Sequence, residues 1–286
     1  MAMSRWIVDT PQRLDFDRVK ELNVRLASGT VAVLASDDEP SVVVSELTGR
    51  PLQVDHDNGV LTISYDSLAW DGLLGLVKPR RDHAAVTITV PAECRSKVGV
   101  LSASAVVTGL RSGASVKSMS GDITLDGVTG DVAAETMSGE LAGCDIDGAI
   151  RLKSMSGGLT LAGGLLDSLE ASTMSGQITA DVALRAAGSV HVTTMSGDVT
   201  LRLPAQSDAR VRLQSTSGQV RTEFESLRTA KAPASHTVSG NVGAGTGHVS
   251  VTTMSGAVTL LRRAVADPRG FEPPNPPVAG MESKTQ

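Results

Sequence analysis

Aromatic residues are scarce in this chain, and their scarcity limits what its core can be. Only 2% of the 286 residues are Phe, Tyr or Trp. Phe224 is the sole aromatic residue between residues 98 and 263. A thick core filled by large rings is therefore excluded for that stretch, which must be packed with Val, Ile, Leu, Ala, Met and Thr. A thin, layered core fits this composition.

Cysteine, basic charge and long apolar runs are also in short supply. Cys94 and Cys144 have no metal-ligand spacing, and we expect both to be free thiols. The formal net charge is -5, so we expect no nucleic-acid partner, because phosphate binding needs a basic face. No apolar run reaches the roughly 18 residues of a membrane-spanning helix. The residues after Met1 lack the apolar stretch of a secretory signal, so we expect a cytoplasmic protein.

One repeated phrase dominates the second half of the chain. It consists of Val or Leu, then an intervening residue, Ser or Thr, usually Met, Ser-Gly, and an apolar residue two places on. Its closing glycines are Gly121, Gly139, Gly157, Gly176, Gly197, Gly218, Gly240 and Gly256. A period of about 20 residues in a strand-rich sequence predicts a stack of short structural repeats.

The alternation of apolar residues predicts that the chain turns a corner at each Ser-Gly. Val192 and Thr194 lie on one face of the strand before Gly197, and Val199 and Leu201 lie on one face of the strand after it. The odd step from Thr194 to Val199 would put the two sets on opposite faces of a flat strand. We therefore expect a corner, with a positive φ at Gly197.

Stacked corners bring like residues together in ladders. The Ser or Thr at the start of the phrase gives Ser118, Thr136, Ser154, Thr173, Thr194, Ser215, Thr237 and Thr253. A second column is formed by the Ser before each closing glycine. Hydroxyls both donate and accept, so we expect the members of each ladder to satisfy one another inside a narrow corner.

A methionine column stands between these two hydroxyl columns. Its members are Met119, Met137, Met155, Met174, Met195 and Met254, and Thr216 and Val238 take the other two positions. If the neighbouring Thr faces inward, the Met should face outward and form an adaptable surface for a partner protein. The alternative is that Met fills an irregular part of the core. The sequence leaves both interpretations open.

The flanking segments lack the tight repeat. We expect residues 1–91 to form a strand-rich segment that caps the solenoid or continues into it, and residues 92–263 to form a β-solenoid of about eight Ser-Gly-cornered coils. Residues 264–286, which are rich in Pro, should be a disordered tail. The last coil ends at Arg262-Arg263, and we expect it to form the free end of the stack, in a monomer or small oligomer.

One stretch of the first segment is apolar and then basic. Its residues are Leu68, Trp70, Leu73, Leu74, Leu76, Lys78, Arg80 and Arg81. This order is typical of an interfacial contact with a membrane, or with a partner. The alternative is a loop that covers an end or edge of the sheet.

Enzymatic chemistry finds little support. A β-helical enzyme that cleaves polysaccharides needs paired carboxylates, usually beside aromatic platforms. Asp122, Glu140 and Asp198 instead recur at one position after Ser-Gly, as turn residues do. No nucleophile elbow, zinc-protease motif or paired Cys-x-x-Cys is present. We expect no catalytic residue, no cofactor and no metal site.

The Thr-Met-Ser-Gly-Asp-Val-Thr-Leu phrase resembles that of a bacterial β-strand-repeat family known as "putative adhesin", a domain of unknown function. Trp6-Ile7-Val8 and the ending from Thr253 to Arg263 look like its actinobacterial members, so the resemblance covers about residues 5–263. It implies no catalytic residues. Some relatives are linked to cell-envelope stress, and the family label implies surface display.

We therefore expect an all-β, non-catalytic interaction or scaffold protein, acting inside the cell near the membrane in the envelope-stress response. Two alternatives stay open. One is a surface adhesin exported by an unrecognised route. The other, less favoured, is a polysaccharide-active β-helix enzyme.

Overall fold

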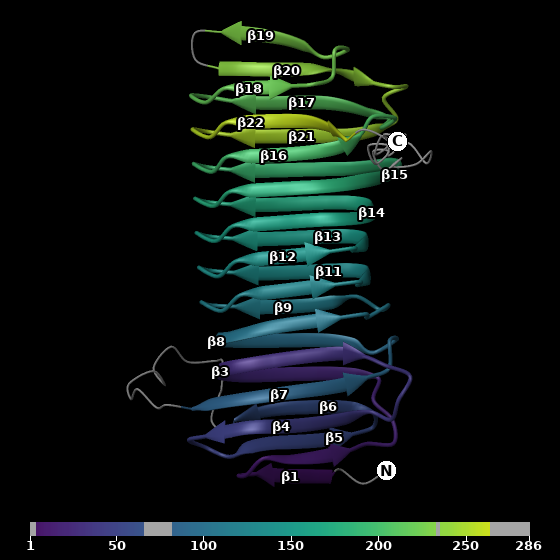
Figure 1. Cartoon of the computed structure of the whole chain (residues 1–286), viewed down its shortest axis with the longest axis vertical. Helices are drawn as coiled ribbons and strands as arrows, with labels where there is room; N and C mark the ends of the chain where they lie inside the picture. The colour runs from purple at the N-terminus through teal and green to yellow at the C-terminus, as the bar shows by residue number, and fades with distance from the viewer. Residues whose placement is uncertain (1–3, 66–81, 233–234, 264–286) are drawn as a thin grey trace, which may run out of the picture.

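The structure is a computed structural model that describes residues 4–65, 82–232 and 235–263. All regular secondary structure in these ranges is β-strand, and the strands join in one 22-stranded sheet. The sheet winds into a long, two-faced stack with the N-terminal strands at one end (Figure 1). The expected all-β solenoid is confirmed.

Antiparallel strands close the N-terminal end of the stack. They are β1 (Ser4–Val8), β2 (Gln12–Asp15), β4 (Ser41–Thr48), β5 (Leu52–Asp57), β6 (Val60–Tyr65) and β7 (His83–Val90). On one face the order is β1, β5, β6, and on the other it is β2, β4, β7. β6 and β7 then both pair in parallel with β3 (Glu21–Ala35), which runs across both faces.

The N-terminal segment continues into the repeats without a break in the sheet. β8 (Arg95–Thr108) pairs in parallel with β3 from Glu21 opposite Arg95 to Leu34 opposite Thr108. The predicted boundary between residues 91 and 92 therefore lies in the turn between β7 and β8, within one continuous stack.

Each later coil places one strand on either face. The strands that lead into a Ser-Gly corner form what we call the lead-in face: β9 (Ala114–Ser118), β11 (Thr129–Thr136), β13 (Asp147–Ser154), the second halves of β14 (Leu159–Thr173) and β15 (Ile178–Thr194), β21 (Gly247–Thr253) and β17 (Ala209–Ser215). The strands that lead away form the return face: β10 (Ile123–Asp126), β12 (Leu141–Cys144), the first halves of β14 and β15, β16 (Val199–Pro204), β22 (Val258–Arg263) and β18 (Val220–Thr222).

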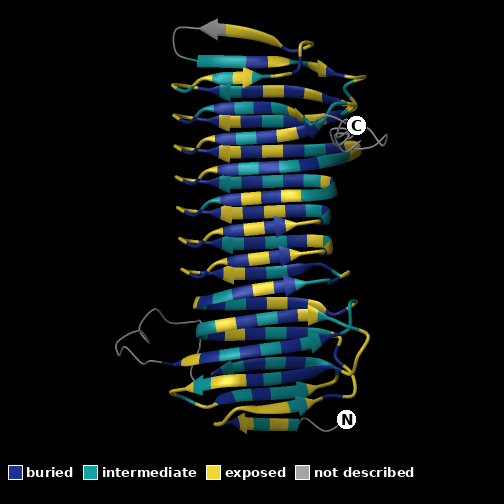
Figure 2. Cartoon of the chain, viewed as in Figure 1, coloured by how far each residue is buried: buried dark blue, intermediate teal, exposed yellow. Residues whose placement is uncertain are grey.

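A thin core lies between the two faces. Val192 and Thr194 before the corner and Val199 and Leu201 after it are all buried, so the predicted change of direction is confirmed. Buried and more exposed residues alternate along nearly every strand, and the Ser-Gly corners form a row of turns along one long edge (Figure 2). Such burial of Val, Leu and Ile from both faces is the main stabilising contribution in a stack of this kind.

The coils do not stack in the order of the sequence. β21 pairs in parallel with β15 on one side, Thr194 opposite Thr253, and with β17 on the other, Ser215 opposite Thr253. β22 lies in the same way between β16 and β18. The last coil is thus inserted inside the stack, and the expectation that Arg262-Arg263 marks its free end was wrong.

The hairpin that caps the C-terminal end explains this order. β20 (Ser235–Val242) runs antiparallel to β17 and covers its outer edge, and β19 (Arg228–Ala232) pairs with β20. The outer edge of β17 is then occupied, so the last repeat pairs with its inner edge. Gly240 lies within β20 opposite Val211. The seventh copy of the phrase, which ends at Gly240, therefore forms part of an antiparallel strand and no corner.

Candidate functional site

Each Ser-Gly corner is closed by a hydrogen bond inside its own repeat. The Gly157 N–H donates to Ser154 Oγ at 2.8 Å, and the Gly176 N–H donates to Thr173 Oγ1 at 3.0 Å. The same bond closes the corners at Gly121, Gly139, Gly197, Gly218 and Gly256. The expectation that these buried hydroxyls bond mainly to one another was wrong, because the glycine N–H three residues on is the nearer donor.

The closing glycine is required by the close approach of the next coil. A Cβ on Gly157 would lie 1.8 Å from the Gly139 carbonyl oxygen, and one on Gly197 would lie 1.8 Å from that of Gly176. The φ angle of Gly197 is not positive, so our expectation for this residue was wrong. Only a residue without a side chain lets corners stack at this spacing.

The methionines of the corners face the solvent. Their exposed fractions run from 44% at Met119 to 56% at Met254, whereas Ser118 and Thr253 beside them are 6% and 1% exposed. Successive residues of an extended chain point to opposite sides, so a buried hydroxyl forces its Met neighbour outward. The interpretation of these residues as core filling is therefore excluded.

The six methionines form one unbroken row, which we call the methionine ladder. From the N-terminal end its order is Met119, Met137, Met155, Met174, Met195 and Met254, each joined to the next by a backbone hydrogen bond from the following Ser. Thr216 follows Met254, because the Ser217 N–H donates to the Met254 carbonyl. In sequence order Thr216 would separate Met195 from Met254, and the inserted coil removes that separation. At about 4.8 Å per coil the ladder is roughly 24 Å long.

A groove runs along one side of the ladder. It has a volume of about 550 Å³ and lies between the first three methionines and the outward side chains of Lys117, Glu135 and Lys153 on the lead-in face. The Lys117 ammonium and the Glu135 carboxylate form an ion pair at 2.9 Å. These three residues were not among the predicted site residues. Their recurrence one position before the hydroxyl in successive repeats was the available signal.

The other side of the ladder carries an acidic residue in three of its six coils. Asp122, Glu140 and Asp198 are exposed just after their closing glycines. The Asp122 carboxylate accepts the Glu140 N–H at 2.9 Å, and the Asp198 carboxylate accepts the Ala257 N–H at 2.7 Å. Two of these carboxylates therefore hold neighbouring coils together. The three acids form a discontinuous acidic row in the coils of Met119, Met137 and Met195, interrupted by Gly158 and Gln177 in the two coils between.

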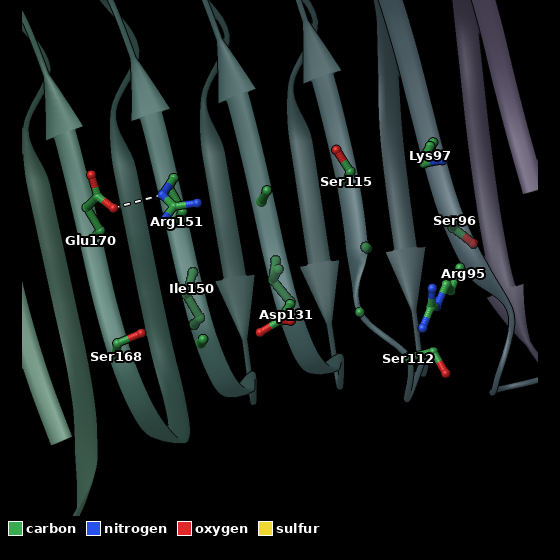
Figure 3. A pocket seen from close by; sticks show the side chains of 15 residues that line it. Arg95, Ser96, Lys97, Ser112, Ser115, Asp131, Ile150, Arg151, Ser168 and Glu170 are labelled. Carbon is green, nitrogen blue, oxygen red and sulfur yellow. Dashed lines mark hydrogen bonds and ion pairs between the residues drawn. The ribbon is translucent and has the colours of Figure 1, made fainter. Parts of the chain in front are cut away.

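A second hollow, of about 450 Å³, lies on the lead-in face, among side chains of both charges that include Arg95, Lys97 and Asp131 (Figure 3). Arg151 Nε and Glu170 Oε2, from neighbouring coils, form an ion pair across it at 2.7 Å. The hydrogen bond from Arg151 lowers the pKa of Glu170. These charges are arranged to neutralise one another. Small residues form the floor, and its lining contains no aromatic side chain that could hold a sugar ring.

Two further features are absent from residues 4–65, 82–232 and 235–263. No group of three or more His, Cys, Asp and Glu side chains is placed there to hold a metal ion. No helix with the length and apolarity needed to cross a bilayer occurs among these residues.

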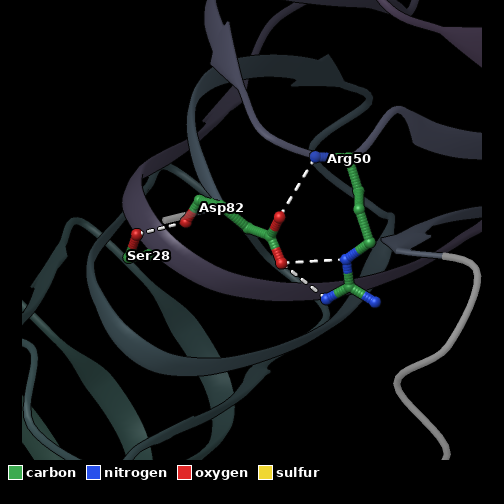
Figure 4. Close-up of polar contacts among 3 residues, drawn as sticks. All are labelled: Ser28, Arg50 and Asp82. Carbon is green, nitrogen blue, oxygen red and sulfur yellow. Dashed lines mark hydrogen bonds and ion pairs between the residues drawn. The ribbon is translucent and has the colours of Figure 1, made fainter. Parts of the chain in front are cut away.

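The predicted membrane or partner contact at Leu68–Arg81 lies outside the described residues, as does the Pro-rich segment 264–286. Asp82, where the described chain resumes, is buried. Its carboxylate accepts hydrogen bonds from the Arg50 backbone N–H and guanidinium, with Nη2 to Oδ2 at 2.6 Å, and Ser28 Oγ donates to its carbonyl (Figure 4). This cluster fixes the start of β7 to the end of β4.

Both cysteines are free thiols, as expected. Cys94 is buried between the faces, and burial raises its thiol pKa to about 11. Cys144 is exposed on the return face, and the charge of Asp145 is the main cause that raises its thiol pKa.

A family model described as Toastrack DUF4097 matches residues 19–261. Solved structures that the chain is similar to include a "putative adhesin" from Bacteroides fragilis, with 12% identity over 89% of this chain and 98% of that one, TM-score 0.44. A "putative adhesin" from Parabacteroides distasonis has 11% identity over 92% and 97%, TM-score 0.32. A "putative lipid binding protein" from the same species has 11% identity over 90% and 96%, TM-score 0.28. No protein of curated function matches the chain.

Proposed function

This chain belongs to the Toastrack DUF4097 family, and from that premise we propose that it is a non-catalytic interaction protein that binds a partner protein along the methionine ladder. The observation that carries the proposal is the unbroken row of six half-exposed methionines. Such a row is an apolar strip of a few hundred Å², a size at which surface patches are often functional.

The corner itself does not require methionine. Thr216 occupies the same position in a corner closed by the same hydrogen bond, Gly218 N–H to Ser215 Oγ at 2.8 Å. The hydroxyl and the glycine are thus sufficient to form the corner, and the exposed Met contributes little to core packing. Met is flexible and polarizable, and it suits surfaces that adapt to a partner. Binding explains the recurrence of Met at this position better than packing does.

The test compares variants with the same added charges in two places. Met155→Lys with Met174→Lys alters the ladder, and Thr124→Lys with Thr160→Lys alters exposed positions of the return face. Each variant and the natural chain are used to capture proteins from native lysate. We expect proteins held by the natural chain and the return-face variant to be lost from the ladder variant. Capture of the same proteins by the ladder variant would contradict the proposal.

We further propose that the protein acts in the cytoplasm near the membrane, in the response to cell-envelope stress. The free, exposed thiol of Cys144 supports a reducing compartment. The link to envelope stress rests on the family resemblance. Fractionation of intact cells tests the location, since protein found outside the cells would contradict it and favour an exported adhesin.

A further inference from the structure

Every carbonyl along the ladder is already paired with the next coil and has little to offer an added strand. The Met119 N–H donates to the Val100 carbonyl at 3.2 Å, and the Met119 carbonyl accepts the Ser138 N–H at 3.1 Å. The carbonyls of the other five methionines accept a Ser N–H in the same way, and the N–H groups of Met155 and Met195 donate to the preceding coil. Binding by strand addition needs free backbone donors and acceptors. A partner segment therefore meets chiefly the side chains of the ladder.

The spacing of the ladder fits a helix better than an extended chain. Methionines follow one another at about 4.8 Å, the distance between neighbouring strands. The apolar side of a helix presents a residue roughly every 5.3 Å along its axis, whereas one side of a strand presents a residue about every 6.7 Å. The spacing of residues on the helix therefore differs from the spacing of the methionines by about 0.5 Å per coil. The flexible Met side chains can accommodate this difference.

The charges on the two sides of the ladder also favour a helix over a lipid surface. Asp122, Glu140 and Asp198 form the discontinuous acidic row on one side, and Lys117 and Lys153 lie with Glu135 along the groove on the other. An amphipathic helix can place basic residues beside the first row and acidic residues beside the lysines. An anionic membrane would be repelled by the acidic row.

We infer that the partner segment is an amphipathic α-helix that lies lengthwise along the methionine ladder. The roughly 24 Å ladder accommodates about 16 helical residues. This inference rests on the proposed function and names the kind of partner that the ladder takes. The helix buries an apolar stripe against the methionines, and its two charged flanks face the acidic row and the groove lysines.

The probe is a synthetic, fluorescently labelled peptide of about 18 residues with Leu at heptad a and d positions, Lys on one flank and Glu on the other. A second peptide has the same residues except for two central prolines, which break the helix. Fluorescence anisotropy is measured with the natural chain, Met155→Lys and the control Thr160→Lys. Flotation with vesicles that contain anionic phospholipid is measured for the same three proteins.

We expect the helical peptide to bind at least about tenfold more tightly than the proline peptide, a difference of about 1.4 kcal/mol. Met155→Lys should weaken that binding by a similar factor, and Thr160→Lys should leave it within about twofold. Equal, ladder-dependent binding of both peptides would overturn the helix and leave the proposed function standing. The inference of a helical partner would also be overturned if the helical peptide did not bind. Vesicle binding that is lost in Met155→Lys would overturn it as well. Failure of the proposed function is recognised separately, by unchanged capture from lysate.

Discussion

Met254 lies directly beside Met195, because the Ser255 N–H donates a hydrogen bond to the Met195 carbonyl oxygen at 3.1 Å. This contact joins the last coil of the sequence to the coil of β15 and β16, and it separates that coil from β17 and β18. The methionine ladder is continuous for this reason. The order of the coils is therefore part of the binding surface as well as of the fold.

Engineered disulfides test that order. His191 and Ser250 are register neighbours on β15 and β21, and Arg212 on β17 lies one strand further away. Neighbouring strands are about 4.8 Å apart, within the range that a disulfide spans, whereas twice that distance is not. In a Cys144→Ser background, His191→Cys with Ser250→Cys should cross-link, and His191→Cys with Arg212→Cys should not. Mass spectrometry of non-reduced peptides identifies the cross-linked pair. Cross-linking of the second pair and not of the first would mean that the coils stack in sequence order.

Two adjacent glycines give a matched test of the corner. A Cβ on Gly157 would lie 1.8 Å from a backbone carbonyl, whereas one on Gly158 meets only the Gln177 carbonyl at 3.7 Å. Gly157→Ala should reduce the free energy of unfolding by about 3 kcal/mol or more, because neither coil can move away without breaking its ladder. Gly158→Ala should be neutral or slightly stabilising. Urea denaturation measures both, and equal effects would refute close approach as the reason for the glycine.

Two threonines of β14 test the hydrogen bond that closes the corner. Thr173 is buried and accepts the Gly176 N–H, whereas Thr160 is exposed on the return face. Thr173→Val keeps the shape and leaves a buried N–H without its partner, at a cost of about 1–3 kcal/mol. Thr160→Val should change stability by less than about 0.5 kcal/mol. Similar losses for the two variants in the same denaturation assay would show that the bond contributes nothing specific.

The Cys94 thiol should make stability fall at alkaline pH. Burial raises its pKa from 9.0 to about 11 in the folded chain, so the unfolded chain ionises first. The stabilising contribution is complete below pH 9 and is lost as the pH rises towards 11, by about 1.4 kcal/mol per pH unit. The difference between the natural chain and Cys94→Ala isolates this effect from that of Tyr65, whose pKa burial raises to about 12. A pH-independent difference between pH 8 and 10 would contradict the assignment.

The corners were predictable and the order of the coils was not. The alternation around Thr194 and Val199 fixes a change of direction whatever the neighbouring coil is, and it also decides that Met195 faces outward. In contrast, Val199, Val220 and Val258 begin similar return strands, so nothing in the repeated phrase says which of them are neighbours. The β19–β20 hairpin determines which return strands are neighbours. That hairpin includes a Ser239-Gly240 pair that matches the phrase but runs in the antiparallel direction.

The reason for glycine at the corner could not be predicted from the sequence either. A positive φ and a close backbone approach both require glycine. The presence of Gly197 in the sequence therefore does not show which of the two causes applies. The groove beside the ladder arises because Lys117, Glu135 and Lys153 come into register on three different strands. Their proximity follows from the stacking of coils, which a single repeat does not reveal.

The most direct test of the methionine ladder as the binding surface is NMR of the chain labelled with ¹³C at its methionine methyl groups. Six of the nine methionines form the ladder, and Met1, Met3 and Met281 lie outside the described residues. On addition of the helical peptide we expect the six ladder signals to shift or broaden together, and the other three to stay unchanged. Saturating peptide that leaves the ladder signals in place, or that perturbs only Met1, Met3 and Met281, would contradict the account.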